Sequence, residues 1–318
     1  MSHRERVAMI GIVSLLSCMS GTSYAAASPV PAATPVAGDA PLVAYQWEDR
    51  IHLVQQDGGH DRLLTPAWNA GPQLHPDWSP DGSQLAFTVD DEDGTRDLWI
   101  VSVDGSDPQR IVDCQATCVA IDDPAWSPDG STIAYSQFGS STRRDDGSLS
   151  IVTLATGETH VLFTCMPGDW VYTPRWSPDG SQIVFELDHF ADPSVDSSDI
   201  VGSGIALVSL TAATPGATML TDFDTFSQYP DWQPGGDLIV FAQATPSGLD
   251  GPFDLYTIDP TGKTLTQVTT LGGTGFQAIQ PTWSPDGLSI IFVHDEMWTS
   301  PTGAVSPGMA LRIPLGMR

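Results

Sequence analysis

The sequence predicts an all-β fold of repeated, four-stranded antiparallel units, and three observations lead to this prediction. The pentapeptide WSPDG occurs four times and the related WQPGG once, so that one tryptophan recurs about every 50 residues. Each copy is followed by a short apolar segment bounded by turn-forming residues, which is the pattern of a β-strand. Gly (30) and Pro (26) are frequent among the 318 residues, as expected for many short strands joined by turns. The repeat tryptophans are Trp78, Trp126, Trp176, Trp232 and Trp283.

Every repeat has the same order of local signals. A proline two residues before the tryptophan favours an extended approach of the chain, and the tryptophan supplies a large apolar side chain that packs between sheets. Pro-Asp-Gly then predicts a tight turn, because Pro fixes φ, Asp bonds the local backbone and Gly accepts positive φ. The strands expected after these turns are Gln84–Val89, Thr132–Gln137, Gln182–Leu187, Leu238–Gln243 and Ser289–His294.

The number of repeats sets the expected architecture. Residues Leu42–Thr65 fit the last three strands of one further unit that lacks WSPDG, and the final unit ends at its third strand near Met309–Leu315. We therefore expect a six-bladed β-propeller of four-stranded antiparallel blades over residues 42–318. Either strands from the two ends of the chain close the ring, or a seam with missing edge strands remains.

The repeated P-x-W-S-P-D-G followed by an apolar strand resembles the TolB-like, WD-type β-propeller family over nearly all of Leu42–Arg318. The resemblance implies the propeller fold and no particular function, because one fold carries many activities. TolB itself has an α/β domain before its propeller, where this chain has only a short Pro/Ala-rich segment, so a role in the Tol system is not implied. Related propellers precede hydrolase domains, but no G-x-S-x-G nucleophile motif occurs in this sequence.

The first 27 residues have the pattern of a secretory signal peptide. Basic residues precede an apolar run from Val7 to Met19, and the small residues Ala25–Ala27 offer a cleavage site. Residues 28–41 are Pro/Ala-rich and are expected to form an extended linker. The segment LLSC also resembles a lipobox, so a lipid anchor at Cys18 is the alternative to simple cleavage. No other segment predicts a transmembrane helix, and both interpretations predict export to the periplasm, the cell surface or the extracellular space.

The net charge limits which partners the protein can bind, and the cysteine content limits which disulfide or metal sites it can form. Twelve Lys and Arg against 39 Asp and Glu give a formal net charge of −27, which repels nucleic acid and anionic lipid. Cys114 and Cys118 lie close together in the sequence and are the expected disulfide, which leaves Cys165 over once the signal peptide is removed. Zinc is the alternative for that pair, but no His stands at ligand spacing beside it.

Loops on one side of the expected propeller supply the candidate binding residues. If the strands of a blade run A to D outward, the B–C and D–A loops share one face, and these are the long and variable loops. Large aromatic side chains in the D–A loops suit a protein, peptide or glycan partner. The loops hold Trp68, Trp170, Tyr172, Phe223, Phe226, Tyr229 and Phe276, of which Trp68, Trp170, Tyr172, Phe226 and Tyr229 are the candidate binding residues. The competing interpretation is that several of them only fill the space between blades.

A polar residue precedes the repeat proline in every unit, where the innermost strand would point it toward the channel mouth. Of these residues, His75 and Asp123 are candidate ligand contacts, and ordered water is the alternative occupant. Acidic loops at Asp90–Gly94 and Asp192–Asp199 suggest calcium, but neither has the D-x-[DN]-x-[DN]-G spacing. The WSPDG aspartates recur at one position of every repeat, as expected for turn stabilisation, and no cofactor is predicted.

These observations predict an exported, non-catalytic propeller that acts as a binding or scaffold module for a protein, peptide or glycan at the cell envelope. The alternative is a propeller enzyme of lyase, glycosidase or cyclase type with its site at the channel mouth. Such an enzyme needs a base and an acid that converge, and His75 with Asp77 or Asp123 is the best pair in the sequence.

Overall fold

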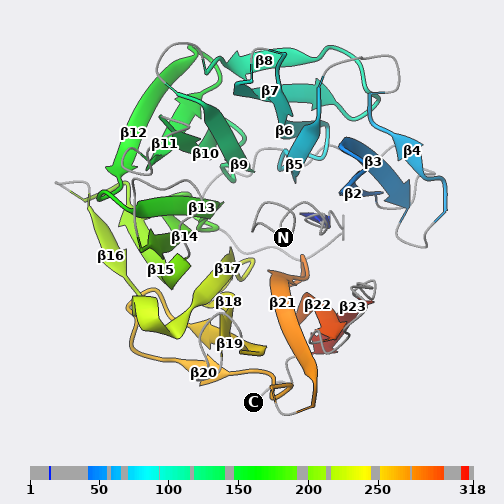
Figure 1. The fold of residues 1–318 in the computed structure, drawn as a ribbon. Coiled ribbons are helices and arrows are strands. Elements are labelled where there is room, and N and C mark those ends of the chain that lie inside the picture. The colour runs from blue at the N-terminus through cyan, green and yellow to red at the C-terminus, as the bar shows by residue number, and fades with distance from the viewer. Residues whose placement is uncertain are drawn as a thin grey trace, which may run out of the picture. The chain divides into compact units, whose positions relative to one another are not determined.

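The computed structural model describes residues 14–15, 42–55, 59–65, 71–92, 94–114, 118–139, 147–191, 200–212, 216–244, 251–272, 274–296 and 309–314. Cys18, Trp68 and the acidic loop Asp192–Asp199 lie outside these residues. Almost all of the regular secondary structure in the described residues is β-strand (Figure 1). Among the described elements, the one helix is a short 3-10 helix, η1 (Phe223–Thr225).

The strands occur at regular intervals along the chain, close to the positions that the repeats predict. They are β1 (Ser14–Leu15), β2 (Leu42–Trp47), β3 (Arg50–Gln55), β4 (Arg62–Leu63), β5 (Gln73–Trp78), β6 (Gln84–Asp90), β7 (Arg96–Ser102), β8 (Gln109–Val112), β9 (Ala120–Trp126), β10 (Thr132–Phe138), β11 (Gly147–Thr153), β12 (Glu158–Thr164), β13 (Asp169–Trp176), β14 (Gln182–Phe190), β15 (Ile200–Ser209), β16 (Ala217–Met219), β17 (Ser227–Trp232), β18 (Ile239–Ala244), β19 (Phe253–Ile258), β20 (Thr266–Gln267), β21 (Phe276–Trp283), β22 (Ser289–Glu296) and β23 (Met309–Pro314).

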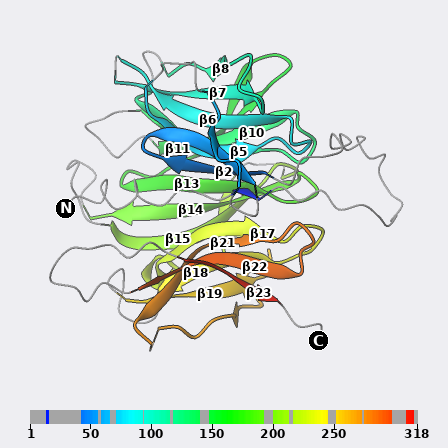
Figure 2. The same cartoon turned by 90° about the vertical axis from the view of Figure 1, so that its right-hand side faces the viewer.

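The chain divides into two compact units. The first contains residues 1–139 and 151–160, and the second contains residues 140–150 and 161–318. In the second unit, β13 to β16 and β17 to β20 form two four-stranded sheets in chain order, and β21 to β23 form a three-stranded sheet. Strands β13, β14 and β15 lie side by side in chain order in both views (Figures 1 and 2).

The other strands form two further sheets. Strands β2, β3 and β4 pair in chain order, and β1 pairs with the free edge of β2. Strands β5 to β12 belong to one sheet, because a single parallel pair, Arg96 with Ala120, joins β7 to β9. The described strands therefore form five sheets, and the count of six four-stranded blades remains a prediction.

The Pro-Asp-Gly segment of each intact repeat forms the turn that the sequence predicts. Asp129 Oδ1 accepts hydrogen bonds from the hydroxyls of Ser127 (2.6 Å) and Ser131 (2.8 Å) and from the Ser131 N–H (3.0 Å). Gly130 follows with φ of 72°. Asp81, Asp179 and Asp286 make corresponding bonds, so these carboxylates are committed to the turns.

The residue before each repeat proline is left-handed, which corrects the expectation of an extended approach. Its φ lies between 46° and 56° in every repeat. The residue and its proline together stand opposite one residue of the next strand, so each sheet contains a β-bulge at this place. The left-handed residues are His75, Asp123, Thr173, Tyr229 and Gln280, and the residues opposite them are the buried aromatics Phe87, Tyr135, Phe185, Phe241 and Phe292.

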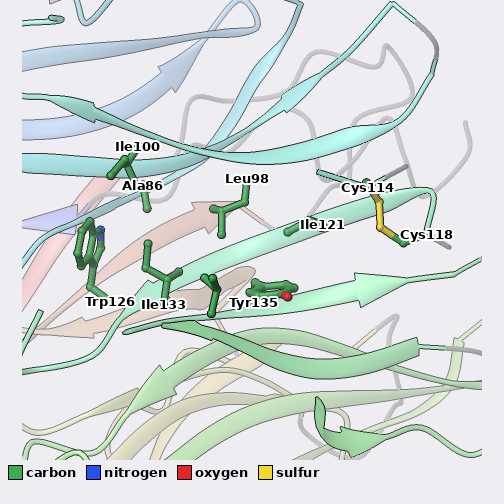
Figure 3. Packing of buried hydrophobic residues seen from close by; sticks show 10 residues of the cluster. Ala86, Leu98, Ile100, Cys114, Cys118, Ile121, Trp126, Ile133 and Tyr135 are labelled. Atoms are coloured by element: carbon green, nitrogen blue, oxygen red, sulfur yellow. A yellow bond between two sulfur atoms is a disulfide. The ribbon is translucent and has the colours of Figure 1, made fainter. Parts of the chain in front are cut away.

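Buried side chains from successive strands make the core. In the first unit, Leu98, Ile121 and Tyr135 pack in one cluster with Trp126 (Figure 3). The disulfide between Cys114 and Cys118, whose Cα atoms are 5.1 Å apart, lies at the edge of the same cluster. Cys114 and Cys118 are therefore both part of the core.

Aspartates just before the repeat tryptophan connect one repeat to the next. Asp77 Oδ2 on β5 accepts a hydrogen bond of 2.8 Å from the Trp126 N–H on β9. Asp231 Oδ2 on β17 accepts one of the same length from the Trp283 N–H on β21, and another from the Thr282 hydroxyl. Burial raises the pKa of Asp231 above its ordinary value, although nearby Arg175 and these hydrogen bonds act in the opposite direction.

Candidate functional site

A polar cluster in the first unit contains two of the candidate residues, His75 and Asp123. His75 Nδ1 lies 3.2 Å from Asp122 Oδ1 and 3.8 Å from Asp123 Oδ1. Arg96 Nη1 lies 2.6 Å from the same Asp122 oxygen, and Arg96 Nε lies 2.5 Å from Asp90 Oδ1. One carboxylate thus holds an imidazole and a guanidinium together, at a place where the His75 side chain is only 20% exposed.

The bulges explain why these side chains meet. His75 and Asp123 are the left-handed residues of β5 and β9, and each conformation turns the chain out of the regular alternation of a strand. Arg96 begins β7 and bonds through its N–H to Val119 O, just before β9. The cluster is therefore built by backbone features of three strands.

Charge and burial act against each other in this cluster. Burial opposes the charged imidazolium, but the carboxylates of Asp123 and Asp122 outweigh it and raise the pKa of His75 above its ordinary value. Burial likewise opposes the charged carboxylate of Asp122, and Arg96 and His75 outweigh it, so the pKa of Asp122 is lowered. The charged forms of both residues therefore stabilise each other in the folded chain.

Sequence reasoning named His75 but not its nearest partner. It proposed Asp77 or Asp123, whereas Asp122 is the closer carboxylate and Asp77 bonds to the Trp126 backbone. The sequence does place two adjacent aspartates, Asp122 and Asp123, before Pro124. In a regular strand their side chains would point to opposite faces, so the sequence did not indicate that both approach His75. Asp90, from the loop considered for calcium, is an ion-pair partner of Arg96.

Aromatic side chains gather at one end of the sheet β13–β16 in the second unit. Trp170 and Tyr172 are two residues apart on β13, with ring centroids 6.1 Å apart. Trp170 also meets the edge of Phe190 on β14, with centroids 5.5 Å apart. Phe190 is buried, whereas Trp170 and Tyr172 are partly exposed, so the Trp170 ring packs against a buried ring and the Tyr172 ring lies beside that of Trp170.

A histidine and a further ring lie at the same end of β13 and β14 but on the opposite face of this strand pair from Trp170, because Asp169 and Trp170 are adjacent in β13. His189 Nδ1 lies 2.6 Å from Asp169 Oδ1, directly across the β13–β14 pair, and the His189 ring lies 5.6 Å from that of Phe223. Gly202 allows Phe223 to approach, since a Cβ there would lie 2.8 Å from the Phe223 Cβ. We call Trp170, Tyr172, His189, Phe190 and Phe223 the aromatic edge.

Exposed apolar side chains border the aromatic edge. Met166, just before β13, is 69% exposed, and Val201 on β15 is 47% exposed. The His189 side chain is 46% exposed, while its partner Asp169 is only 10% exposed. Asp169 therefore orients an imidazole whose other ring nitrogen, Nε2, is left for an outside partner.

Cys165 lies beneath the aromatic edge and is a poor nucleophile. A Cβ on Gly147 would lie 3.2 Å from its Sγ and 3.6 Å from Trp170 Cδ1, so the three residues pack closely. Burial, together with the nearby Asp169 carboxylate, raises the pKa of the Cys165 thiol to about 12. Its thiolate is scarce at neutral pH, which argues for a packing role.

The remaining aromatic candidates lie beside this edge in the chain. Phe226 ends η1 in a left-handed conformation, three residues after Phe223. Tyr229 donates its backbone N–H to Glu186 Oε2 on β14, at 3.0 Å. Trp68 lies outside the described residues.

The described residues contain neither a metal-binding cluster nor a membrane-spanning helix. In the described part of the chain, no group of three or more His, Cys, Asp or Glu side chains is arranged to hold a metal ion. Over the same residues, no helix has the length and apolarity needed to cross a membrane.

Comparison with known proteins finds likeness in structure. No protein-family model matches the sequence, and no curated protein matches it. An assigned TolB from Agrobacterium tumefaciens has a TM-score of 0.58 and 19% identity, over 77% of this chain and 83% of that one. An oligogalacturonate lyase in complex with manganese has a TM-score of 0.53 and 20% identity, over 82% of this chain and 67% of that one.

A third solved structure is the β-propeller domain of the Trilobed protease from Pyrococcus furiosus. Its TM-score is 0.53 with 14% identity, over 87% of this chain and 79% of that one. Identities this low carry the fold and not the activity. The likeness to TolB and to other propellers, together with the nearly all-β structure, shows that this chain has a TolB-like β-propeller fold.

Proposed function

We propose that this protein is an exported, non-catalytic β-propeller that captures a protein, peptide or glycan through the aromatic edge. The observation that carries the proposal is the support of Trp170, a partly exposed ring that packs against buried Phe190 and close to Gly147, with the partly exposed ring of Tyr172 beside it. Rings held on a sheet lose little freedom when a partner binds. Trp and Tyr are also among the residues that contribute most to binding energy at interfaces.

The charge and the sequence signals support an extracytoplasmic binding role. A net charge of −27 disfavours nucleic acid as the partner. The N-terminal signal pattern supports export. TolB-like propellers supply a structural parallel, since one of the similar solved structures is a TolB.

The test is partner capture by the exported chain and by a double variant. Trp170→Ala with Tyr172→Ala should abolish in-cell crosslinking to partners identified by mass spectrometry, while the melting temperature moves by no more than about 5 °C. Trp47→Ala is the matched control, because Trp47 is 59% exposed in the first unit, and it should retain capture. Capture that survives the double variant would contradict the proposal.

A second candidate function is a propeller enzyme with its site at the His75 cluster. The ion pairs of His75 with Asp122 and Asp123 favour it, because a carboxylate that orients an imidazole is a common arrangement for proton transfer. The oligogalacturonate lyase shows that a similar fold can carry catalysis. Any activity that persists in His75→Gln would exclude this cluster as its site.

A further inference from the structure

The surroundings of the aromatic edge are strongly acidic. Residues 166–172, 186–190, 200–204 and 219–226 contain five carboxylates and no Lys or Arg. The excess of negative charge is therefore found in these segments as well as in the whole chain, and it favours a positively charged partner.

The carboxylates differ in how the fold uses them. Asp169 is held against His189, and Glu186 accepts the Tyr229 N–H, so both serve the structure. Asp222 and Asp224 are exposed and lie in or beside η1, the element that carries Phe223. Asp222 occupies the N-cap position of η1 but makes no side-chain capping bond. These two side chains therefore offer negative charge next to an aromatic ring.

Aromatic faces and exposed carboxylates together suit cationic side chains. A Lys ammonium or Arg guanidinium is attracted to the face of an aromatic ring, and beside Phe223 its charge is also balanced by Asp222 or Asp224. The aliphatic stem of the same side chain covers apolar surface such as Met166 and Val201. An acidic peptide or acidic glycan would meet like charge, and a neutral one would gain nothing from Asp222 and Asp224.

We propose that the occupant of the aromatic edge is a basic peptide segment of another exported protein that crosses this end of β13 and β14, with Lys or Arg side chains over Trp170 and Tyr172 on one face and beside Phe223, Asp222 and Asp224 on the other. This inference rests on the proposed function above and adds the chemistry of the partner. Attraction between opposite charges also speeds association and weakens as salt screens it.

The experiment is calorimetric titration of the full chain with three synthetic peptides of equal length. They share Gly and Leu positions, and all other positions are Lys, Gln or Glu. The Lys peptide should bind about threefold to tenfold more tightly than the Gln peptide, and the Glu peptide should bind most weakly. High salt should remove most of this difference.

Two pairs of variants separate the rim charge from the rings. Asp222→Asn with Asp224→Asn should bring the Lys peptide to the affinity of the Gln peptide. Asp107→Asn with Asp237→Asn removes two exposed charges elsewhere and should leave the preference unchanged. Trp170→Ala with Tyr172→Ala should abolish binding of the Lys peptide.

Each contrary outcome has one meaning. Equal affinity for all three peptides, or no peptide binding, would overturn the proposal of a basic partner. The proposed function would still be tested separately, by partner capture in cells. A charge preference that persists in Asp222→Asn with Asp224→Asn would overturn the role of these aspartates. Lys-peptide binding that survives the loss of Trp170 and Tyr172 would overturn the aromatic edge itself.

Discussion

Five residues of different chemistry, among them His75 and Thr173, share a left-handed backbone because each precedes a repeat proline at a bulge. This conformation costs a non-glycine residue about 1 kcal/mol or more, so side-chain preference does not explain its recurrence. The buried aromatic opposite each bulge holds it in place, as Phe87 does for His75. The residue at the bulge is thus free to vary, and in one repeat it is a histidine that reaches two carboxylates.

The titration of His75 should appear in the pH dependence of stability. Its pKa is raised in the folded chain, so its contribution is fully present below the unfolded value near 6.5. That contribution is lost as the pH rises through the folded pKa. The free energy of unfolding should therefore fall with rising pH above about 6.5 in the wild type, measured by urea unfolding.

His75→Gln should remove this pH dependence, because glutamine does not titrate. His60→Gln is the matched control, since His60 is an exposed histidine in the same unit, and it should leave the slope unchanged. A slope that is the same in His75→Gln and in the wild type would mean that other groups produce it.

At the scale of the elements, the WSPDG turns join the first two strands of each repeat by a fixed set of side-chain bonds. Asp129→Ala should lower the free energy of unfolding by about 1 kcal/mol, because the turn loses the carboxylate that accepts from Ser127 and Ser131. Thermal or urea unfolding measures this change.

Asp237→Ala is the control for the turn, since Asp237 is exposed, has no left-handed backbone and lies outside any WSPDG segment. It should change stability by no more than about 0.5 kcal/mol. Loss of partner capture in Asp129→Ala without loss of stability would show that this carboxylate belongs to a site and not to the turn.

The same elements show how far sequence patterns predict structure. The apolar strands after the turns were predicted to within about three residues of their observed ends, because alternation and Pro-Asp-Gly are local signals. The bulges were missed, since the rule for the residue before proline favours an extended chain and only packing against Phe87 or Phe185 overrides it. Helix η1 was also missed, because three residues give no periodicity.

The candidate site was predicted in part, for a related reason. Trp170 and Tyr172 were named from residue type, which a sequence displays directly, but they were expected in a loop, whereas both lie on β13. The pairing of His189 with Asp169 depends on the register of β13 against β14. The pairing of His75 with Asp122 depends on the bulge in β5 and on the position of β9 beside it. Cross-strand register is set by the fold as a whole, so single-sequence reasoning did not reach these pairs.

At the scale of the whole molecule, the expected signal peptide and the described structure meet at β1. Its two residues, Ser14 and Leu15, pair with Ala44 and Val43 on the edge of β2, yet they lie within the segment expected to be removed. Two pairs add little to a sheet that β2, β3 and β4 already form. The folded part should therefore not depend on them.

The last prediction is that export removes residues 1–27 and leaves a chain that starts at Ser28 and is as stable as the full one. The small residues at Ala25–Ala27 suit a signal peptidase, and the sheet β2–β4 keeps its own pairs when β1 is lost. Intact-mass measurement of the exported protein should give a start at Ser28, and Cys18→Ala should export equally well. A chain expressed from Ser28 should melt within about 2 °C of the full-length chain, given the small contribution of a two-residue strand. A lipid-modified N-terminus at Cys18 would contradict the predicted cleavage. A large loss of stability without residues 1–27 would contradict the predicted independence from β1, and it would mean that β1 stabilises the sheet of β2 to β4.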